Sequence, residues 1–219
     1  MSPQHPSPLT TLGAGFADPV HGAQQVFRTL LDATSRPGKV WALPDHLGLQ
    51  APASRVDGQP WQPATAAALL TLLDAECRVH LVGELASADA ASWLRFHTGA
   101  HLALAGQAQF CAVRATEATP ALLASLSAGS EEAPQDSATL VIEVAAMDST
   151  HALEDAALLH LNGPGIQRRQ GLAVRGLSPA FWHARQQQQA LYPQGVDLLL
   201  CCGHRVAALP RSTLLDLEF

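Results

Sequence analysis

The chain has 219 residues, of which 47% are hydrophobic and 15% are charged. This composition excludes an intrinsically disordered chain and predicts a folded unit that buries about 70% of its unfolded surface. The formal net charge of −6 offers no overall attraction to nucleic acid or to an anionic membrane, so we expect neither as a partner, although a local basic patch stays open.

The first predicted elements are helices with recognisable start signals. Residues 1–14 form a polar leader rich in Pro, Ser and Thr, which we expect to be mobile. A helix should then begin at Pro19, capped by Asp18, and end before Pro37. Its apolar face should combine five side chains: Val20, Ala23, Phe27, Leu30 and Leu31. Four more helices are predicted, opening at Pro63, Ser87, Thr119 and Ser178.

Seven short apolar runs between the helices predict strands, because many of their residues are β-branched. They read KVWAL, RVHLVG, QFCAVRA, TLVIEVAAM, AALLHLNG, VDLLLCC and HRVAALP. The last two are separated by little more than Gly203 and should form an antiparallel hairpin. Strands alternate with helices up to about residue 150 and dominate afterwards. This order predicts a single α/β domain over 15–219, with a mixed sheet flanked by helices.

Several common catalytic motifs are missing from the sequence. The pair Gly38-Lys39 lacks the Ser or Thr that must follow it in a phosphate-binding P-loop. Gly163 and Gly165 begin a dinucleotide-binding pattern, but Arg168 stands where its third glycine belongs, so a tight turn is predicted. Neither a G-x-S-x-G nucleophile elbow nor an H-E-x-x-H zinc motif occurs. We therefore predict no catalytic residue and no metal site.

Lysine and cysteine usage narrows the chemistry further. The 13 basic residues include one lysine, Lys39, which follows a Pro-Gly turn and leads into a strand. That is an unusual setting for a pyridoxal phosphate lysine, so we expect no cofactor. The four cysteines (77, 111, 201 and 202) form no C-x-x-C motif. Cys201 and Cys202 should point to opposite faces of a strand as buried thiols. No signal peptide or membrane span is evident, which predicts a soluble cytoplasmic protein.

Five blocks of sequence, taken in order, resemble the H subunit of bacterial carbon–phosphorus lyase, the machinery that degrades phosphonates. They read DPVHGAQQVFRTLLDATSRPG, LLTLLD, WLRFHTG, LNGPGI and GVDLLLCCGHRVAALPRST. The resemblance extends from about Phe16 to Thr213. Its first and last blocks are the most specific, because each mixes turn, apolar and basic positions over about twenty residues.

This resemblance implies a cytoplasmic assembly with the G, I and J subunits, in which alkylphosphonate is coupled to the ribose of ATP with loss of adenine. It also implies the fold of pyridoxal-phosphate-dependent transferases without their cofactor. The expected function is that of a non-catalytic or co-catalytic subunit of ribose 1-methylphosphonate 5′-triphosphate synthase. The isolated chain is expected to be inactive and to form a homodimer. A direct phosphonate- or nucleotide-binding subunit and an independent pyridoxal phosphate enzyme are the alternatives.

The block WLRFHTG places basic side chains at the end of a predicted helix. Trp93, Phe96 and His97 should share one face, with Arg95 and Thr98 on another. Basic residues in a last helical turn bond free carbonyls and complement the helix dipole, so a structural role explains the cluster. The alternative left open is a ligand pocket or subunit interface formed by Arg95 and His97.

Three other arginines are candidates for ligand or interface contacts. Arg36 lies at the end of the first predicted helix, with the same two interpretations. Arg205 and Arg211 lie in the last resembling block and would anchor an interface there, because arginine is enriched among binding hot spots. Arg168 and Arg169 follow the Gly-Pro-Gly turn and are expected to be solvated, with an acidic partner as the alternative.

Overall fold

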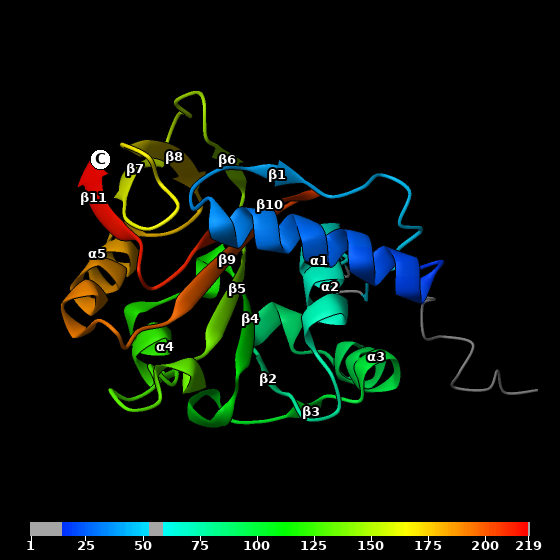
Figure 1. The fold of residues 1–219 in the computed structure, drawn as a ribbon. Coiled ribbons are helices and arrows are strands. Elements are labelled where there is room, and N and C mark those ends of the chain that lie inside the picture. The colour runs from blue at the N-terminus through cyan, green and yellow to red at the C-terminus, as the bar shows by residue number, and fades with distance from the viewer. Residues whose placement is uncertain (1–14, 53–58, 219) are drawn as a thin grey trace, which may run out of the picture.

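The computed structural model describes residues 15–52 and 59–218, so the predicted leader, residues 1–14, lies outside the described residues. The described chain forms one α/β domain (Figure 1). Its helices are α1 (Pro19–Ser35), α2 (Pro63–Leu72), α3 (Ala88–Thr98), α4 (Pro120–Ser125) and α5 (Pro179–Gln187). Its strands are β1 (Trp41–Ala42), β2 (Arg78–Leu81), β3 (His101–Leu102), β4 (Phe110–Arg114), β5 (Thr139–Glu143), β6 (Ala146–Asp148), β7 (Ala157–Asn162), β8 (Gln170–Arg175), β9 (Asp197–Cys202), β10 (Arg205–Leu209) and β11 (Leu214–Glu218).

The larger sheet has seven strands in the order β1-β10-β9-β5-β4-β2-β3. Neighbours from β9 to β3 pair in parallel, whereas β10 and β1 add antiparallel strands at one edge. The predicted mixed sheet is therefore confirmed. The predicted hairpin is β9–β10, in which Cys202 pairs with Arg205.

A second, antiparallel sheet of four strands, in the order β11-β7-β8-β6, was not predicted. The run TLVIEVAAM, expected as one strand, is divided between the two sheets. β5 ends at Glu143 in the larger sheet and β6 begins at Ala146 in the smaller one. Between them the Val144 N–H donates to Cys201 and the Ala145 N–H donates to Arg175, at N···O distances of 2.8 and 3.1 Å. The backbone changes partner sheet within two residues.

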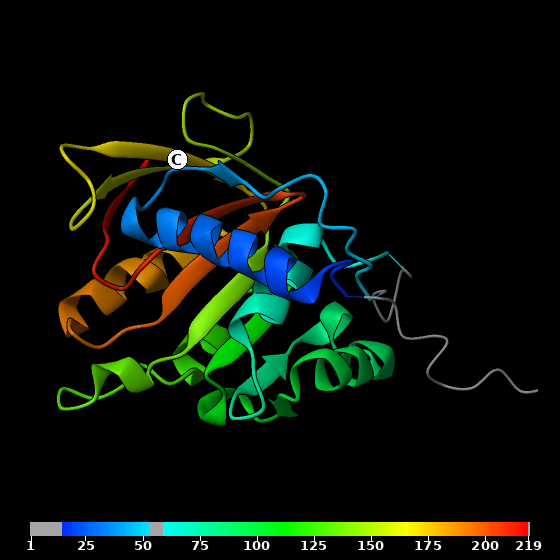
Figure 2. The same cartoon turned by 45° about the vertical axis from the view of Figure 1, so that its right-hand side comes forward.

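The larger sheet lies between two apolar cores. Helices α1, α2 and α3 cover one face, while α4, α5 and the smaller sheet cover the other (Figures 1 and 2). Strand β5 shows how the sequence serves both cores: Val141 faces the first, whereas Leu140 and Ile142 face the second. Successive side chains of a strand point to opposite faces, so a continuous apolar run is what a sheet covered on both sides requires.

All five predicted helices are confirmed, and their first residues explain why. Asp18 accepts a hydrogen bond from the His21 N–H at 3.0 Å, which satisfies one of the free donors at the start of α1. Ser or Thr does the same for α3, α4 and α5. Proline occupies the opening of α1, α2, α4 and α5, where its missing N–H costs nothing. No helix among the described residues is long and apolar enough to cross a membrane.

The predicted inner face of α1 was largely wrong. The helix buries Gly22, Val26, Leu30 and Ala33 against the sheet and α2. Three side chains of the predicted set are instead exposed: Val20 by 71%, Phe27 by 46% and Leu31 by 53%. Apolar residues lie on two adjacent stripes of this helix, and the sheet covers the stripe that includes the small residues. The other stripe forms an exposed apolar face.

Candidate functional site

The topology of the larger sheet marks one place at its edge. After β2 the chain passes through α3 to β3 on one side, whereas after β4 it passes through α4 to β5 on the other side. In open α/β sheets, ligands bind outside the carboxyl ends of strands where the connections diverge in this way. A hollow of about 430 Å³ lies at this point, lined in part by Gln62, Glu84, Arg114, Glu143 and Gly176. We call it the carboxyl-edge cleft.

Three charged side chains at the ends of neighbouring strands dominate this cleft. Arg114, the last residue of β4, forms an ion pair with Glu84, just beyond β2, and its Nε lies 3.4 Å from a carboxylate oxygen of Glu143 at the end of β5. Glu143 also accepts a hydrogen bond from the Gln62 N–H at 2.7 Å. Its side chain is only 3% exposed. Burial raises the pKa of Glu143, and the Gln62 N–H and the Arg114 guanidinium oppose that rise.

A third carboxylate stabilises the turn after β2. The Glu84 N–H lies 3.2 and 3.3 Å from the two carboxylate oxygens of Glu117. Gly83 has a φ of +49°, and a Cβ at this position would overlap the Glu117 carboxylate. The glycine therefore lets the acidic side chain approach the backbone closely.

The charges that line the cleft are paired with one another. Glu84 and Glu143 share the Arg114 guanidinium, so each has an internal partner. The buried thiols of the larger sheet are poor nucleophiles, because burial raises the pKa of Cys111 to about 12 and also raises that of Cys201. Within residues 15–52 and 59–218, no three His, Cys, Asp or Glu side chains are grouped to hold a metal ion. The network suits a structural or positioning role.

The block WLRFHTG forms the end of α3. Gly99 adopts a left-handed conformation with φ of +77° and its N–H donates to the Arg95 carbonyl, while Thr98 donates its hydroxyl to Leu94. Trp93 is buried, and its ring centroid lies 5.1 Å from that of His97. Phe96 is 60% exposed, although its ring also contacts His97. These contacts give the block a structural role.

The five predicted site residues are not gathered at one place. His97 lies beside Gly15, just before α1, whereas Arg36 lies just after α1. A helix of this length, 17 residues, spans about 25 Å at its 1.5 Å rise per residue, so the two cannot contact one small ligand together. Arg95 is exposed at the end of α3. None of the five lines the carboxyl-edge cleft.

The three other predicted arginines have different surroundings. Arg36 forms an ion pair with Asp32 at 2.8 Å and lies over the Trp41 ring, with Cζ 5.3 Å from the centroid. Arg205 is exposed near the tip of the β9–β10 hairpin, with Nη2 3.9 Å from the Cys202 sulfur. Arg211 is engaged within the fold by Asp197 and Ser137.

The three charged residues of the carboxyl-edge cleft were not predicted from the sequence. Glu84, Arg114 and Glu143 each stand at, or within three residues of, the end of an apolar strand. Because the carboxyl ends of parallel strands meet at one edge, charges in that position were the available signal. Recognising it requires knowing that β2, β4 and β5 are parallel neighbours.

Comparison with known proteins gives the family. The family model described as "Bacterial phosphonate metabolism protein (PhnH)" matches residues 14–216. The chain belongs to the PhnH family. This confirms the resemblance to the carbon–phosphorus lyase H subunit seen in the five sequence blocks.

Two curated relatives of this chain are both described as subunits. The first is the alpha-D-ribose 1-methylphosphonate 5-triphosphate synthase subunit PhnH of Rhizobium meliloti (strain 1021). It is 35% identical over 204 residues, which cover 93% of this chain and 94% of that protein. The second is a putative C-P lyase subunit protein, HtxG, of Stutzerimonas stutzeri. It is 34% identical over 198 residues, which cover 89% and 86% of the two chains.

Proposed function

We propose that this chain is a non-catalytic or co-catalytic subunit of the cytoplasmic carbon–phosphorus lyase complex, required for the transferase reaction that forms ribose 1-methylphosphonate 5′-triphosphate. The observation that carries the proposal is the 35% identity to a synthase subunit over 94% of that relative's length. The G, I and J subunits are the proposed partners.

The chemistry of the described side chains favours a non-catalytic or co-catalytic role for this chain. The carboxylates of the carboxyl-edge cleft are bound to Arg114, and the thiols of Cys111 and Cys201 have raised pKa values. The likeness to the pyridoxal phosphate transferase fold stays a prediction of the resemblance. Lys39, which an independent enzyme of that class would need, is exposed and does not line this cleft.

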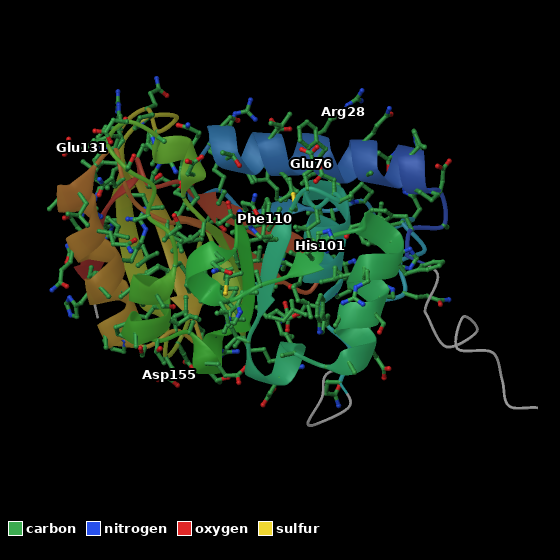
Figure 3. The ribbon with its side chains drawn as sticks, turned by 90° about the horizontal axis from the view of Figure 1, so that it is seen from below. Arg28, Glu76, His101, Phe110, Glu131 and Asp155 are labelled. Atoms are coloured by element: carbon green, nitrogen blue, oxygen red, sulfur yellow. The ribbon has the colours of Figure 1, made fainter. Side chains whose placement is uncertain are left out.

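The exposed apolar face of α1 is the proposed partner surface. Phe27 and Leu31 on this face border a groove of about 250 Å³, whose other walls include Leu72 and Phe110. Figure 3 shows Phe110 below α1, on the side away from Arg28. An apolar face of this kind is costly in water and typically marks a contact with another protein. We propose that a sister subunit covers it in the complex, and a second copy in the homodimer formed by the isolated chain.

Co-expression with the other lyase subunits tests this function. The wild-type chain should co-purify with them, and Leu31→Asp should be lost because it places a charge in the apolar interface. Leu104→Asp is the matched control, since Leu104 is a 72% exposed leucine distant from α1 in sequence. Failure of the wild-type chain to co-purify would refute the assembly role. Adenine release from ATP and methylphosphonate by the isolated chain would refute the supporting role.

A further inference from the structure

Four of the 13 basic side chains gather around one hollow that the proposed function does not use. Its volume is about 400 Å³, and its lining includes Arg36, Lys39, Arg168 and Arg169. The first two belong to the turn between α1 and β1, and the other two to the loop between β7 and β8. We call this site the basic hollow. It includes the chain's single lysine.

Two glycines let these segments touch and so bring the four charges together. Gly38 has φ of +78°, and a Cβ there would overlap the Leu161 side chain on β7 and lie 3.0 Å from Gln170 Cγ. Gly165 has φ of +80°, and a Cβ there would overlap the Ser35 carbonyl oxygen. Each segment therefore approaches the other through a position without a side chain. Residues more than 120 positions apart in the chain share one wall.

The local charge favours an anion despite two opposing groups. Asp32 is paired with Arg36 and removes one positive charge. The carboxyl end of α1 adds a partial charge of about −0.5. Against four cations these leave an excess of about +2.5 in a molecule whose formal net charge is −6. Arg168, Arg169 and Lys39 are all exposed, so a ligand in the basic hollow can reach their side-chain donors.

We propose that the basic hollow binds a small anion with two or more linked phosphoryl groups. Three guanidinium groups match phosphate oxygens with paired donors, and the ammonium of Lys39 adds a point charge. The volume falls in the range of small-molecule sites, about 300 to 1,000 Å³. An extended polyanion such as nucleic acid is disfavoured, because it would also approach the negatively charged remainder of the surface.

Calorimetric titration of the full-length chain with inorganic tripolyphosphate, at low ionic strength and in a phosphate-free buffer, tests this site. The double variant Arg168→Ala/Arg169→Ala should bind about tenfold more weakly or worse, since each lost contact is charge-assisted. Lys39→Ala should also weaken binding. Arg28→Ala, on the outward side of α1 (Figure 3), is the matched control and should bind like the wild type. Circular dichroism checks that each variant is folded.

Two further results would overturn the proposal. Absence of tripolyphosphate binding by the wild-type chain would do so, as would equal binding by the wild type and the double variant. Arg95→Ala separates the two anion hypotheses, because it should leave binding unchanged, whereas loss of binding would place the site at the end of α3. The double variant should still co-purify with the other subunits. If it does not, and the wild type ignores tripolyphosphate, the four charges form a protein-docking surface and the anion site is refuted.

Discussion

Removing the Arg114 side chain should strongly destabilise the fold, although this side chain is 18% exposed. Arg114→Met leaves Glu143, whose side chain is 3% exposed, without a cationic partner in a buried site. Breaking a buried pair in this way costs about 3–5 kcal/mol, because the remaining charge is uncompensated. The double variant Arg114→Met/Glu143→Gln should recover at least about 2 kcal/mol, since a neutral amide avoids that cost. Arg175→Met, an exposed arginine at the end of β8, should cost less than about 0.5 kcal/mol.

The free energy of unfolding, measured by urea denaturation at pH 5 and pH 8, checks the reasoning. Burial raises the folded-state pKa of Glu143 above its ordinary value of 4.5, and loss of Arg114 removes one of the groups that oppose the rise. The stability associated with protonated Glu143 is present below its unfolded pKa and is lost as pH rises through the folded pKa. Arg114→Met should therefore be more destabilising at pH 8 than at pH 5, and the double variant should lack this difference. A cost below about 1 kcal/mol for Arg114→Met at pH 8, or no recovery in the double variant, would refute the account.

Three further predictions concern the helix ends and the thiols. Gly99→Ala should lower the free energy of unfolding by about 1–2 kcal/mol, because Gly99 has φ of +77°. Gly171→Ala is the control and should be nearly neutral, because a Cβ there would meet open space. Thermal melts compare the two variants, and equal melting temperatures would contradict the prediction. Asp18→Ala should cost about 1 kcal/mol by loss of the α1 cap, with faster amide exchange in the first turn, and unchanged exchange there would count against the cap. Cys111 and Cys201 should resist iodoacetamide at pH 8 until the protein is unfolded, because burial raises the pKa of both thiols. Mass spectrometry measures this, and alkylation of either thiol in the native protein would contradict the prediction.

The helices could be predicted because their signals are local. Asp18, Ser87, Thr119 and Ser178 each bond a backbone N–H three residues further on, so four residues contain the whole start signal. The inward face of α1 could not be read in the same way. Apolar side chains lie on two stripes, and the choice between them depends on the shape of the sheet and of α2.

The strands were predicted less completely because their pairing is not local. β8 and β11 were missed: β8 reads QGLAVR and opens on a polar residue and a glycine, while β11 reads LLDLE, and both pair only with distant segments. The cleft was missed for a related reason. Glu143 gains its neighbour Arg114 only when β4 and β5 lie side by side, and its neighbour Gln62 only when the start of α2 packs at the end of β5. A one-dimensional pattern shows a charge after a strand but not which other strand ends beside it.

The passage of residues 139–148 from one sheet to the other determines how the protein can be cut. A break between β5 and β6 would leave the first fragment without β9 and β10 of the larger sheet. The second fragment would carry these two strands together with all four strands of the smaller sheet. Neither half is a separable module. Truncation studies should therefore treat the described chain as indivisible, and a tag or fusion is better attached at a terminus than within this crossing.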